Sequence, residues 1–240
     1  MAKAQRQEID LLGNTVEYEV QHSSDASEPR IDVDIHGVTV VVPEGEEVQP
    51  TELLKENAAW VIDKQRNYDT YRDQVPDRSF EAGESFPFLG EDRELVIEAR
   101  QKHGVDEDSI RLRKSAVEQS SIKQVLENFY RSRARDYLTK RTDHYAEQMG
   151  VEYEKLELRN QRTRWGSCST GGTISLNWRL IMAPLDVVDY LVVHELAHLT
   201  EQNHGRDFWR LVGEYVPEYK EKAEWLEQNS ARLIFSEEDL

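Results

Sequence analysis

Cysteine is almost absent from this chain of 240 residues. The single thiol, Cys168, excludes an intramolecular disulfide framework and also a zinc site built from several thiolates. Any bound metal ion must therefore be held by histidine and carboxylate side chains. No sequence pattern supplies Cys168 with a catalytic partner, so we expect it to pack as a small apolar side chain.

Long apolar segments are also missing. No run approaches the length that spans a bilayer, and the first residues contain no apolar stretch of the kind found in secretory signals. The sequence therefore predicts a cytoplasmic protein without a membrane partner. Its hydrophobic content of 38%, with five Trp, ten Tyr and six Phe, is sufficient to form a packed core.

Basic residues are outnumbered by acidic ones. The chain has 47 Asp and Glu against 30 Lys and Arg, a net charge of −17, and the acidic residues are spread along its length. Such a surface repels nucleic acid and suits a salt-rich cytoplasm, where screening removes the self-repulsion. We therefore expect a halophilic protein that loses structure in low salt.

One basic segment, residues 123–143, interrupts the acidic pattern. Two interpretations remain open: this segment contacts phosphates, or it is a solvated helix face with ion pairs between successive turns. The charge pattern favours the solvated face.

Hydrophobic periodicity predicts a β-rich N-terminal subdomain over residues 15–105. Apolar residues alternate in three segments, a helical stripe follows, and a further strand pair completes the region. The predicted elements are strands over 15–20, 31–35 and 38–42, a helix over 51–72, and a hairpin of 85–90 with 93–98.

The remaining sequence predicts a catalytic subdomain over residues 106–235 that is richer in helix, giving an α+β protein. Its expected elements are a helix over 120–149 ended by Gly150, strands over 156–159 and 173–177 that form a hairpin around a loop at 166–172, a helix from Pro184 onward, and a helix over 207–215. The apolar run 187–193 predicts that the helix from Pro184 onward is buried on most sides.

That buried helix contains His194-Glu195-Leu196-Ala197-His198. Two histidines four residues apart project from the same helix face, close enough to share a metal ion. Glu195 lies beside them and could reach a metal-bound water without ligating the metal. This is the position of a general base when zinc lowers the pKa of its water.

A third ligand is expected six residues after His198, at His204. The intervening Gln202-Asn203 offers a residue that tolerates left-handed geometry, which would end the helix and return His204 to the metal. The alternative third ligand is a later carboxylate, Glu214 or Glu218, as in peptidases with two histidines and one glutamate. The sequence order and spacing favour His204.

This constellation predicts hydrolysis of peptide bonds: Zn²⁺ polarises the scissile carbonyl, and Glu195 takes a proton from the bound water and returns it to the leaving amine. The partner would be a peptide or protein substrate. A non-catalytic, zinc-stabilised module that binds nucleic acid or a peptide is the alternative. The oligomeric state and the substrate stay open.

Candidate substrate-binding residues lie around the same region. If strand 173–177 were an edge strand over the metal, it could bind an extended peptide through its main chain, which would place Ser175 and Asn177 near the substrate. Arg164 and Tyr190 could orient the loop or stabilise an oxyanion. Structural roles explain Asn177, Arg164 and Tyr190 about equally well.

Several segments together resemble the YgjP-like metallopeptidase family, over about residues 15–230. They are Arg164–Ser169, Ile174–Leu180, Ala183–Pro184, His194–His198, Asn203–Gly205 and Phe208–Trp209, with Val40–Pro43 and Gly83–Gly90 in the N-terminal half. The resemblance implies a minimal zincin, with helices packed on a small antiparallel sheet, related to the SprT-like and Wss1-like peptidases. It also implies that both subdomains form one domain and that His204 carries the last ligand.

The spacing of the three histidines also matches the metzincin pattern. That pattern requires glycine at the position of Glu201 and a methionine turn downstream, whereas the last methionine here is Met182. We therefore reject the metzincin interpretation.

Overall fold

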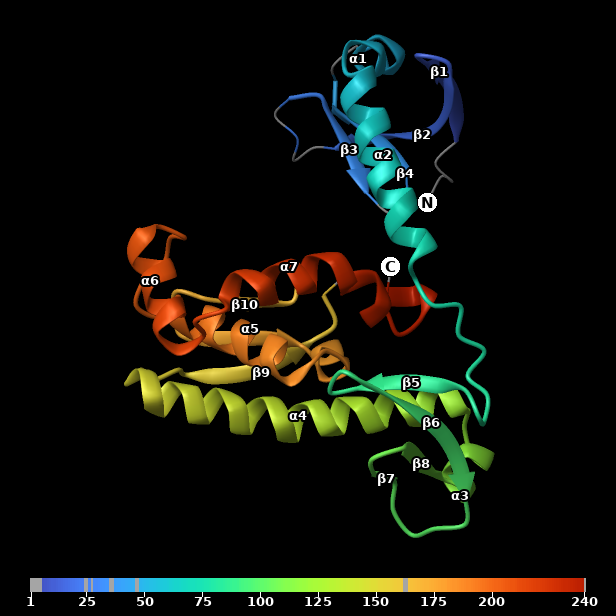
Figure 1. The fold of residues 1–240 in the computed structure, drawn as a ribbon. Helices are drawn as coiled ribbons and strands as arrows, with labels where there is room; N and C mark the ends of the chain where they lie inside the picture. The colour runs from blue at the N-terminus through green and yellow to red at the C-terminus, as the bar shows by residue number, and fades with distance from the viewer. Residues whose placement is uncertain are drawn as a thin grey trace. The chain divides into compact units, whose positions relative to one another are not determined.

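The computed structural model divides the chain into two compact units, residues up to Val75 and Pro76–Asp239 (Figure 1). We describe each unit by itself. The described residues are 6–23, 26, 28–34, 37–45, 48–161 and 164–239. The division differs from the predicted boundary at residue 105, because the strands between 85 and 98 share a hydrophobic core with the C-terminal helices.

The first unit is a four-stranded mixed sheet, in the order β1-β2-β4-β3, covered by two helices. Alternation predicted three of the strands. The strand β1 was not expected, and Ile35, the last residue of one predicted strand, lies outside the described residues. The elements are β1 (Gln7–Leu11), β2 (Asn14–Ser23), β3 (Arg30–Asp34), β4 (Gly37–Pro43), α1 (Pro50–Glu56) and α2 (Ala58–Asp73).

The single helix predicted over 51–72 is broken at Asn57. Its backbone has φ −107° and ψ 16°, and its side-chain amide donates a hydrogen bond to the Leu53 carbonyl at 2.9 Å. An asparagine that bonds its own backbone competes with the helix, which explains the break. The predicted apolar stripe is buried across both helices, at Leu54, Ala58, Val61 and Ile62.

The second unit begins with a four-stranded sheet, in the order β5-β6-β8-β7. The predicted hairpin between β5 and β6 is confirmed, and β6 also pairs in parallel with β8. A short helix then leads into the longest helix of the chain. The elements are β5 (Ser85–Phe88), β6 (Glu91–Glu98), β7 (Gly104–Val105), β8 (Ser109–Arg113), α3 (Lys114–Glu118) and α4 (Ile122–Met149).

Helix α4 has both of its ends determined by local chemistry. The hydroxyl of Ser121 accepts a hydrogen bond from the Gln124 backbone at 3.2 Å, which satisfies one free amide of the first turn. Gly150 ends the helix in the left-handed conformation, with φ 65°, as predicted.

The second sheet of this unit has three strands: β9 (Lys155–Arg159), β10 (Gly166–Cys168) and β11 (Thr173–Asn177). Their order is β10-β11-β9, so β11 is the central strand. The predicted hairpin of 156–159 with 173–177 is wrong, because β9 and β11 pair in parallel and the antiparallel partner of β11 is β10. The sheet is therefore mixed, and one of its two edge strands, β10, is the segment expected to be a loop.

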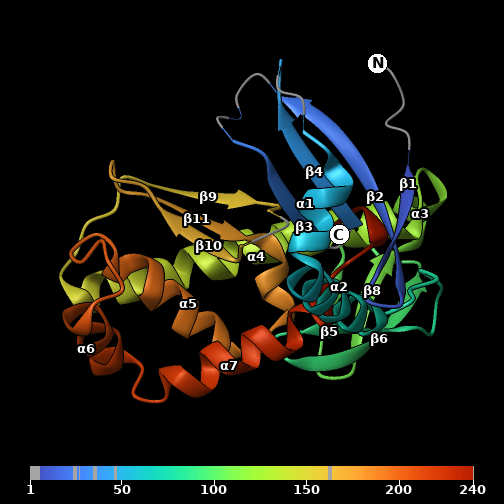
Figure 2. The same ribbon diagram turned by 90° about the horizontal axis from the view of Figure 1, so that it is seen from above.

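The remaining elements are η1 (Trp178–Met182), α5 (Leu185–Ala197), α6 (Arg206–Tyr215), α7 (Tyr219–Asn229), η2 (Ser230–Leu233) and η3 (Glu237–Asp239). Helix α5 packs against β10 and β11, and α6 and α7 pack against α5 (Figure 2). The α+β class is confirmed. No helix within the described part of the chain is both long enough and apolar enough to span a membrane.

Helix α5 is the central element of the second unit. Its residues 187–193 are buried except for Asp189, as the apolar run predicted. The carboxylate of Asp189 accepts two hydrogen bonds of 2.6 Å from the Arg141 guanidinium on α4. Two parallel bonds between charged groups fix the orientation of both partners, so this pair holds α5 on α4.

Candidate active site

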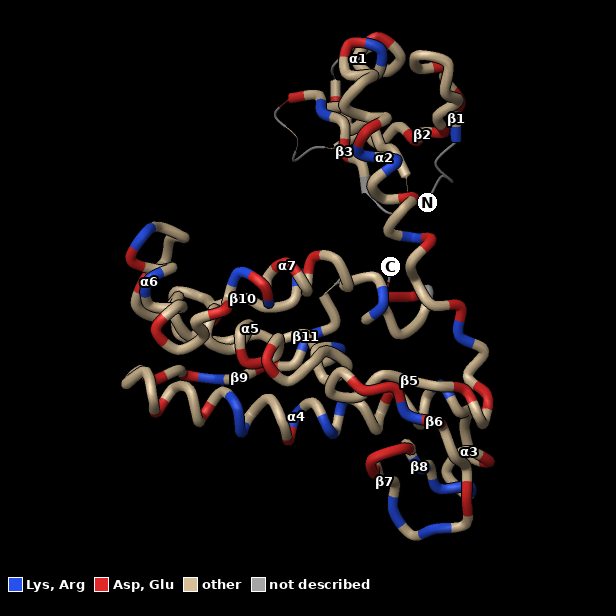
Figure 3. Tube along the Cα trace, in the orientation of Figure 1, with Lys and Arg blue, Asp and Glu red and all other residues tan. Residues whose placement is uncertain are grey.

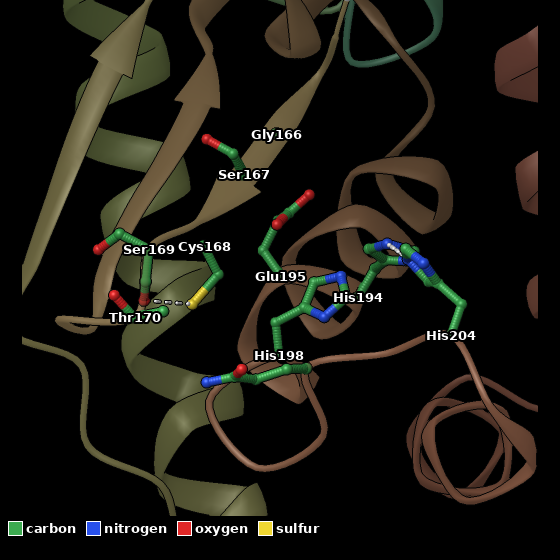
Figure 4. Close-up of a pocket in the computed structure, with 10 residues that line it drawn as sticks. Gly166, Ser167, Cys168, Ser169, Thr170, His194, Glu195, His198 and His204 are labelled. Atoms are coloured by element: carbon green, nitrogen blue, oxygen red, sulfur yellow. Dashed lines mark hydrogen bonds between the residues drawn. The ribbon is translucent and has the colours of Figure 1, made fainter.

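The structure brings His194, His198 and His204 together. His194 lies in the last turn of α5, His198 caps that helix, and His204 precedes α6 (Figure 4). One ligand atom from each histidine lies within 4.8 Å of the other two, and the Nε2 atoms of His194 and His204 are 3.0 Å apart. Among the described residues, this is the one group of three or more potential metal ligands with such spacing.

Hydrogen bonds fix the orientation of the two histidines of α5. His198 Nδ1 lies 3.1 Å from the Glu201 carbonyl, which can only accept, so Nδ1 carries the proton and Nε2 is a free lone pair. His194 Nδ1 lies 3.4 Å from the Tyr190 hydroxyl. Such outer partners determine the tautomer and ring direction of metal-binding histidines.

The chain turns back to His204 differently from our prediction. Helix α5 ends at Ala197, and the Ala197 carbonyl accepts bonds from the amides of Thr200 and Glu201 in the turn that follows. Asn203 has no positive φ. The left-handed residue expected at 202–203 is therefore absent, because the turn is closed by backbone hydrogen bonds several residues earlier.

Aromatic rings on α6 support the three imidazoles. Phe208 is fully buried, and its ring centroid lies 4.9, 4.6 and 4.7 Å from those of His194, His198 and His204. Trp209 stacks on His204 at 5.6 Å. The sequence predicted a helix over 207–215 that contains Phe208, but gave no sign that this ring contacts all three histidines.

Burial favours the neutral form of His194 and His198 by lowering the pKa of each. Desolvation, followed by the charges of His198 and His204, lowers the pKa of His194 to about 4. The pKa of His198 is also lowered, again mainly by burial. A neutral imidazole has the lone pair that a metal ion needs. Both side chains can therefore bind a metal ion at neutral pH without first losing a proton.

Glu195 lies in the same pocket but outside the histidine group. It is 4% exposed, and its Oε2 has no hydrogen-bond partner among the described residues. Burial raises its pKa from 4.5 to about 7, and the charge of Arg164 opposes the shift. A buried carboxyl group with a pKa near neutrality is suited to take up and release a proton.

Gly166, on the edge strand β10, is a site residue that sequence reasoning missed. A Cβ atom built on it would lie 2.5 Å from Oε1 of Glu195 and 2.7 Å from its Cγ, so only glycine leaves room for this carboxylate. The sequence pattern predicted a tight loop here, and the motif Arg-Trp-Gly-Ser-Cys was the only signal of a closer role.

The pocket around these groups has a volume of about 430 Å³. Residues of β10 and the turn after it form one wall, and the histidines form the other (Figure 4). Cys168 lies in this wall, half-buried, with its pKa raised by burial and by the charge of Glu195. Its thiol is not part of the histidine group, and it packs partly against the core as expected.

The four predicted substrate-binding residues have different positions. Ser175 and Asn177 belong to the central strand β11, so neither lies on an edge strand. Asn177 is 1% exposed and caps η1, accepting a bond from the Arg179 amide at 3.1 Å. Tyr190 contacts His194 from within the helix, and Arg164 is exposed next to the pocket.

The alternative third ligands do not lie at the site. Glu214 pairs with Arg210 at 3.2 Å and Glu218 with Lys222 at 3.7 Å, and both are outside the histidine group. The basic segment 123–143 also makes internal contacts: Arg131 pairs with Glu127 at 2.7 Å. Such pairing between successive turns is what the solvated-face interpretation predicts.

Comparison with known proteins places these observations in a family. Two solved structures are similar to the chain. The metallopeptidase zymogen abylysin of Pyrococcus abyssi has a TM-score of 0.37 and 24% identity, over 40% of this chain and 96% of that chain. Jannalysin, a metallopeptidase zymogen of Methanocaldococcus jannaschii, has a TM-score of 0.36 and 20% identity, over 39% and 96%. No curated protein matches. A family model described as a YgjP-like metallopeptidase domain matches residues 27–229, and the chain therefore belongs to the YgjP-like metallopeptidase family.

Proposed function

We propose that this protein is a zinc-dependent peptidase in which His194, His198 and His204 hold the metal and Glu195 is the general base. The observation that carries the proposal is the buried, unpartnered Oε2 of Glu195 in the pocket that the three histidines line. Leaving such an atom unpaired is costly, which is explained if a water or substrate group normally bonds to it.

The donor set fits zinc. Zn–N bonds of about 2.0–2.1 Å in a tetrahedron place ligand nitrogens roughly 3.3 Å apart, and the Nε2 atoms of His194 and His204 are 3.0 Å apart. Neutral imidazoles suit zinc among the common divalent ions. Three protein ligands, where a structural zinc site uses four, leave one coordination position for water and substrate.

The chain's own residues provide the remaining chemistry. Zinc, when bound, would polarise the scissile carbonyl and lower the pKa of water. Glu195 then takes a proton from the attacking water and returns it to the leaving amine, for which a pKa of about 7 is well matched. Gly166 leaves the space that Glu195 occupies. The Tyr190 hydroxyl orients the imidazole of His194, and the Glu201 carbonyl orients that of His198.

Strand β10 can bind an extended substrate along its free edge. This strand pairs with β11 on one side and is the edge of its sheet, and its residues Gly166, Ser167 and Cys168 line the pocket. A peptide added to this edge would present its carbonyl groups to the histidines through main-chain hydrogen bonds. The role first predicted for strand 173–177 therefore belongs to β10.

The rival function is a zinc-stabilised module that binds nucleic acid or a peptide without catalysis. A closed structural site gains nothing from a buried carboxylate without a partner, since that group costs stability. The internal pairing of Arg131 and Arg141 also removes two of the cations that nucleic-acid binding would use. Both observations favour the peptidase.

Substituting Glu195→Gln and His204→Ala tests the proposal. Glu195→Gln should retain one zinc per chain, measured by elemental analysis, while peptide cleavage falls by about two orders of magnitude or more. His204→Ala should lose both zinc and activity. Cleavage by Glu195→Gln at the rate of the unmodified protein would contradict the proposal.

A further inference from the structure

A second hollow, of about 310 Å³, lies next to the histidine pocket. The two hollows share Gly166 and Glu195, and none of the three histidines lines the second one. Glu195 therefore stands between the metal-binding side and this second hollow. Because the two spaces meet at the catalytic carboxylate, a substrate bound at the histidines has its neighbouring residue next to the second hollow.

Most of the residues that line the second hollow have apolar or aromatic side chains. Tyr190 and Leu191 of α5 are 5% and 6% exposed, Leu226 of α7 is 6% exposed, and Ala223 lies one turn earlier on α7. Trp165, just before β10, completes the wall, and its indole is held by the Arg179 guanidinium 5.2 Å away. Concave apolar surface of this kind gains stability by covering an apolar side chain.

Charge in the second hollow has one sign only. Its lining includes two carboxyl groups, Glu195 and Glu227, and no lysine or arginine. Glu227 is exposed, so it lies toward solvent. An acidic substrate side chain would find no cation among the residues that line the hollow and would be repelled by Glu227, which argues for discrimination against Asp and Glu.

The position of Glu195 determines which substrate residue enters. Glu195 returns the proton to the leaving amine, so this amine lies within hydrogen-bond reach of the carboxyl group, close to the hollow that Glu195 also lines. We propose, on the basis of the function proposed above, that this hollow binds the side chain of the residue whose amine is released. The preferred residue is large and apolar or aromatic.

Product analysis tests this inference. The zinc-loaded protein is incubated with a mixture-based peptide library, and mass spectrometry identifies the new N-terminal residue of each product. Large apolar and aromatic residues should be enriched there, and Asp and Glu depleted. Uniform usage of all residues at this position would overturn the inference.

Ala223→Leu fills the hollow and provides the first variant. It should lower kcat/KM by about tenfold for a peptide that releases Phe or Leu, and leave a peptide that releases Ala nearly unchanged. The matched control is Gln228→Leu, an exposed position on the same helix that does not line the hollow. Equal preference profiles for the two variants would overturn the inference.

Glu227→Lys provides a second variant at an exposed position, where folding is not at risk. It should raise the share of products that begin with Glu, because a cation then faces the incoming carboxylate. If the share of products that begin with Glu were unchanged, the side chain at position 227 would not contact the substrate. The proposed position of the substrate side chain in this hollow would then be wrong.

Binding measured without turnover separates this inference from the proposed function. Calorimetric titration of zinc-loaded Glu195→Gln with the same peptides should show weaker binding when Leu replaces Ala223. If peptides with apolar residues bound more tightly but the unmodified protein cleaved none of them, the proposed role of the hollow would stand and the peptidase function would be contradicted. If the protein cleaved peptides without any preference for the released residue, the peptidase function would stand and the proposed role of the hollow would be contradicted.

Discussion

Gly166 is the residue whose size most constrains the site. Its missing Cβ would lie 2.5 Å from Oε1 of Glu195, closer than any non-bonded contact allows. We expect Gly166→Ala to displace the carboxylate and reduce kcat by about a hundredfold, since catalytic groups tolerate little misplacement. Zinc content should stay at one per chain, because the three atoms nearest to the added Cβ all belong to Glu195. Kinetics with a model peptide and elemental analysis measure both quantities.

Gly171 is the matched control for this substitution. A Cβ there would have Ser169 Oγ as its nearest neighbour, at 3.9 Å, which is ordinary contact. Gly171→Ala should therefore retain nearly full activity, although Gly171 lies only a few residues after Gly166, in the turn that follows β10. Equal losses in both alanine variants would show that the loop as a whole, rather than the space for Glu195, determines the rate.

Glu195 also makes the stability of the metal-free protein depend on pH. Its pKa is about 7 in the folded protein against 4.5 ordinarily, so the folded state binds its proton more tightly. This contribution is complete below pH 4.5 and is lost as the pH rises to about 7, amounting to roughly 3 kcal/mol. Replacement by Gln removes the dependence. The free energy of unfolding of Glu195→Gln relative to the unmodified protein should therefore rise between pH 4.5 and pH 8.

Urea unfolding in the presence of a chelator measures this difference. Glu152→Gln, at an exposed position, is the control and should show no comparable change across the pH range. If the Glu195→Gln difference were flat with pH, the carboxyl group would not be desolvated in the folded protein, and its assignment as a base poised near neutrality would fail.

At the scale of elements, α6 supports the metal site through Phe208. The ring is fully buried and lies within 5 Å, centroid to centroid, of all three imidazoles. Phe208→Ala should cost about 3–5 kcal/mol of unfolding free energy and also weaken zinc binding, because the imidazoles lose the surface that orients them. Chemical unfolding and zinc titration with a competing chelator measure the two effects.

Phe86 offers a matched comparison for that loss. It is equally buried in the same core but lies on β5, and it contacts Phe80 rather than the histidines. Phe86→Ala should therefore reduce stability by a similar amount while the folded protein retains its zinc affinity. If both alanine variants bound zinc equally well, α6 would contribute only general packing and not the orientation of the ligands.

The sequence predicted helices better than strand pairing, for a physical reason. The ends of α4 depend on local groups, a cap at Ser121 and a left-handed glycine at Gly150, so they are visible in the sequence. The parallel pairing of β9 with β11 is not a local hairpin, because the chain between them first forms β10, which pairs with the other side of β11. Short polar strands such as Gly166–Cys168 have no alternation to detect, and this strand was predicted to be a loop.

The same distinction applies to the site. Histidine spacing on a helix could be predicted because 3.6 residues per turn places residues 194 and 198 on one face. The return of His204 was also predicted, although by a different turn. The contacts from Gly166 and Phe208 could not be predicted, since each depends on how separate elements pack against α5.

At the scale of the whole molecule, the chain has two hydrophobic cores, and the division at Val75 was not predicted. The strands after this point alternate much like those before it, so periodicity alone cannot assign them to one core or the other. What separates them is packing: β5, β6 and β8 contribute Phe86, Leu95 and Ile110 to the core that also contains α5.

The acidic surface gives a prediction for the molecule as a whole. With a net charge of −17, acidic positions occur throughout both units (Figure 3). Salt shortens the screening length from about 10 Å at 0.1 M to about 3 Å at 1 M, which weakens repulsion among carboxylates more than it weakens close ion pairs. The urea concentration at half-unfolding, followed by circular dichroism, should therefore rise with NaCl concentration.

A variant with less charge distinguishes this repulsion from a general effect of salt on hydrophobic burial. Its substitutions convert exposed carboxylates of the second unit to amides: Asp77→Asn, Glu81→Gln, Glu152→Gln and Glu224→Gln. If repulsion is the cause, this variant should be more stable than the unmodified protein in dilute buffer and gain less from added NaCl. Full helicity of the unmodified protein in dilute buffer would contradict adaptation to high salt. Hydrophobic burial is the same in both proteins, so an equal dependence of stability on NaCl would show that salt does not act by relieving charge repulsion.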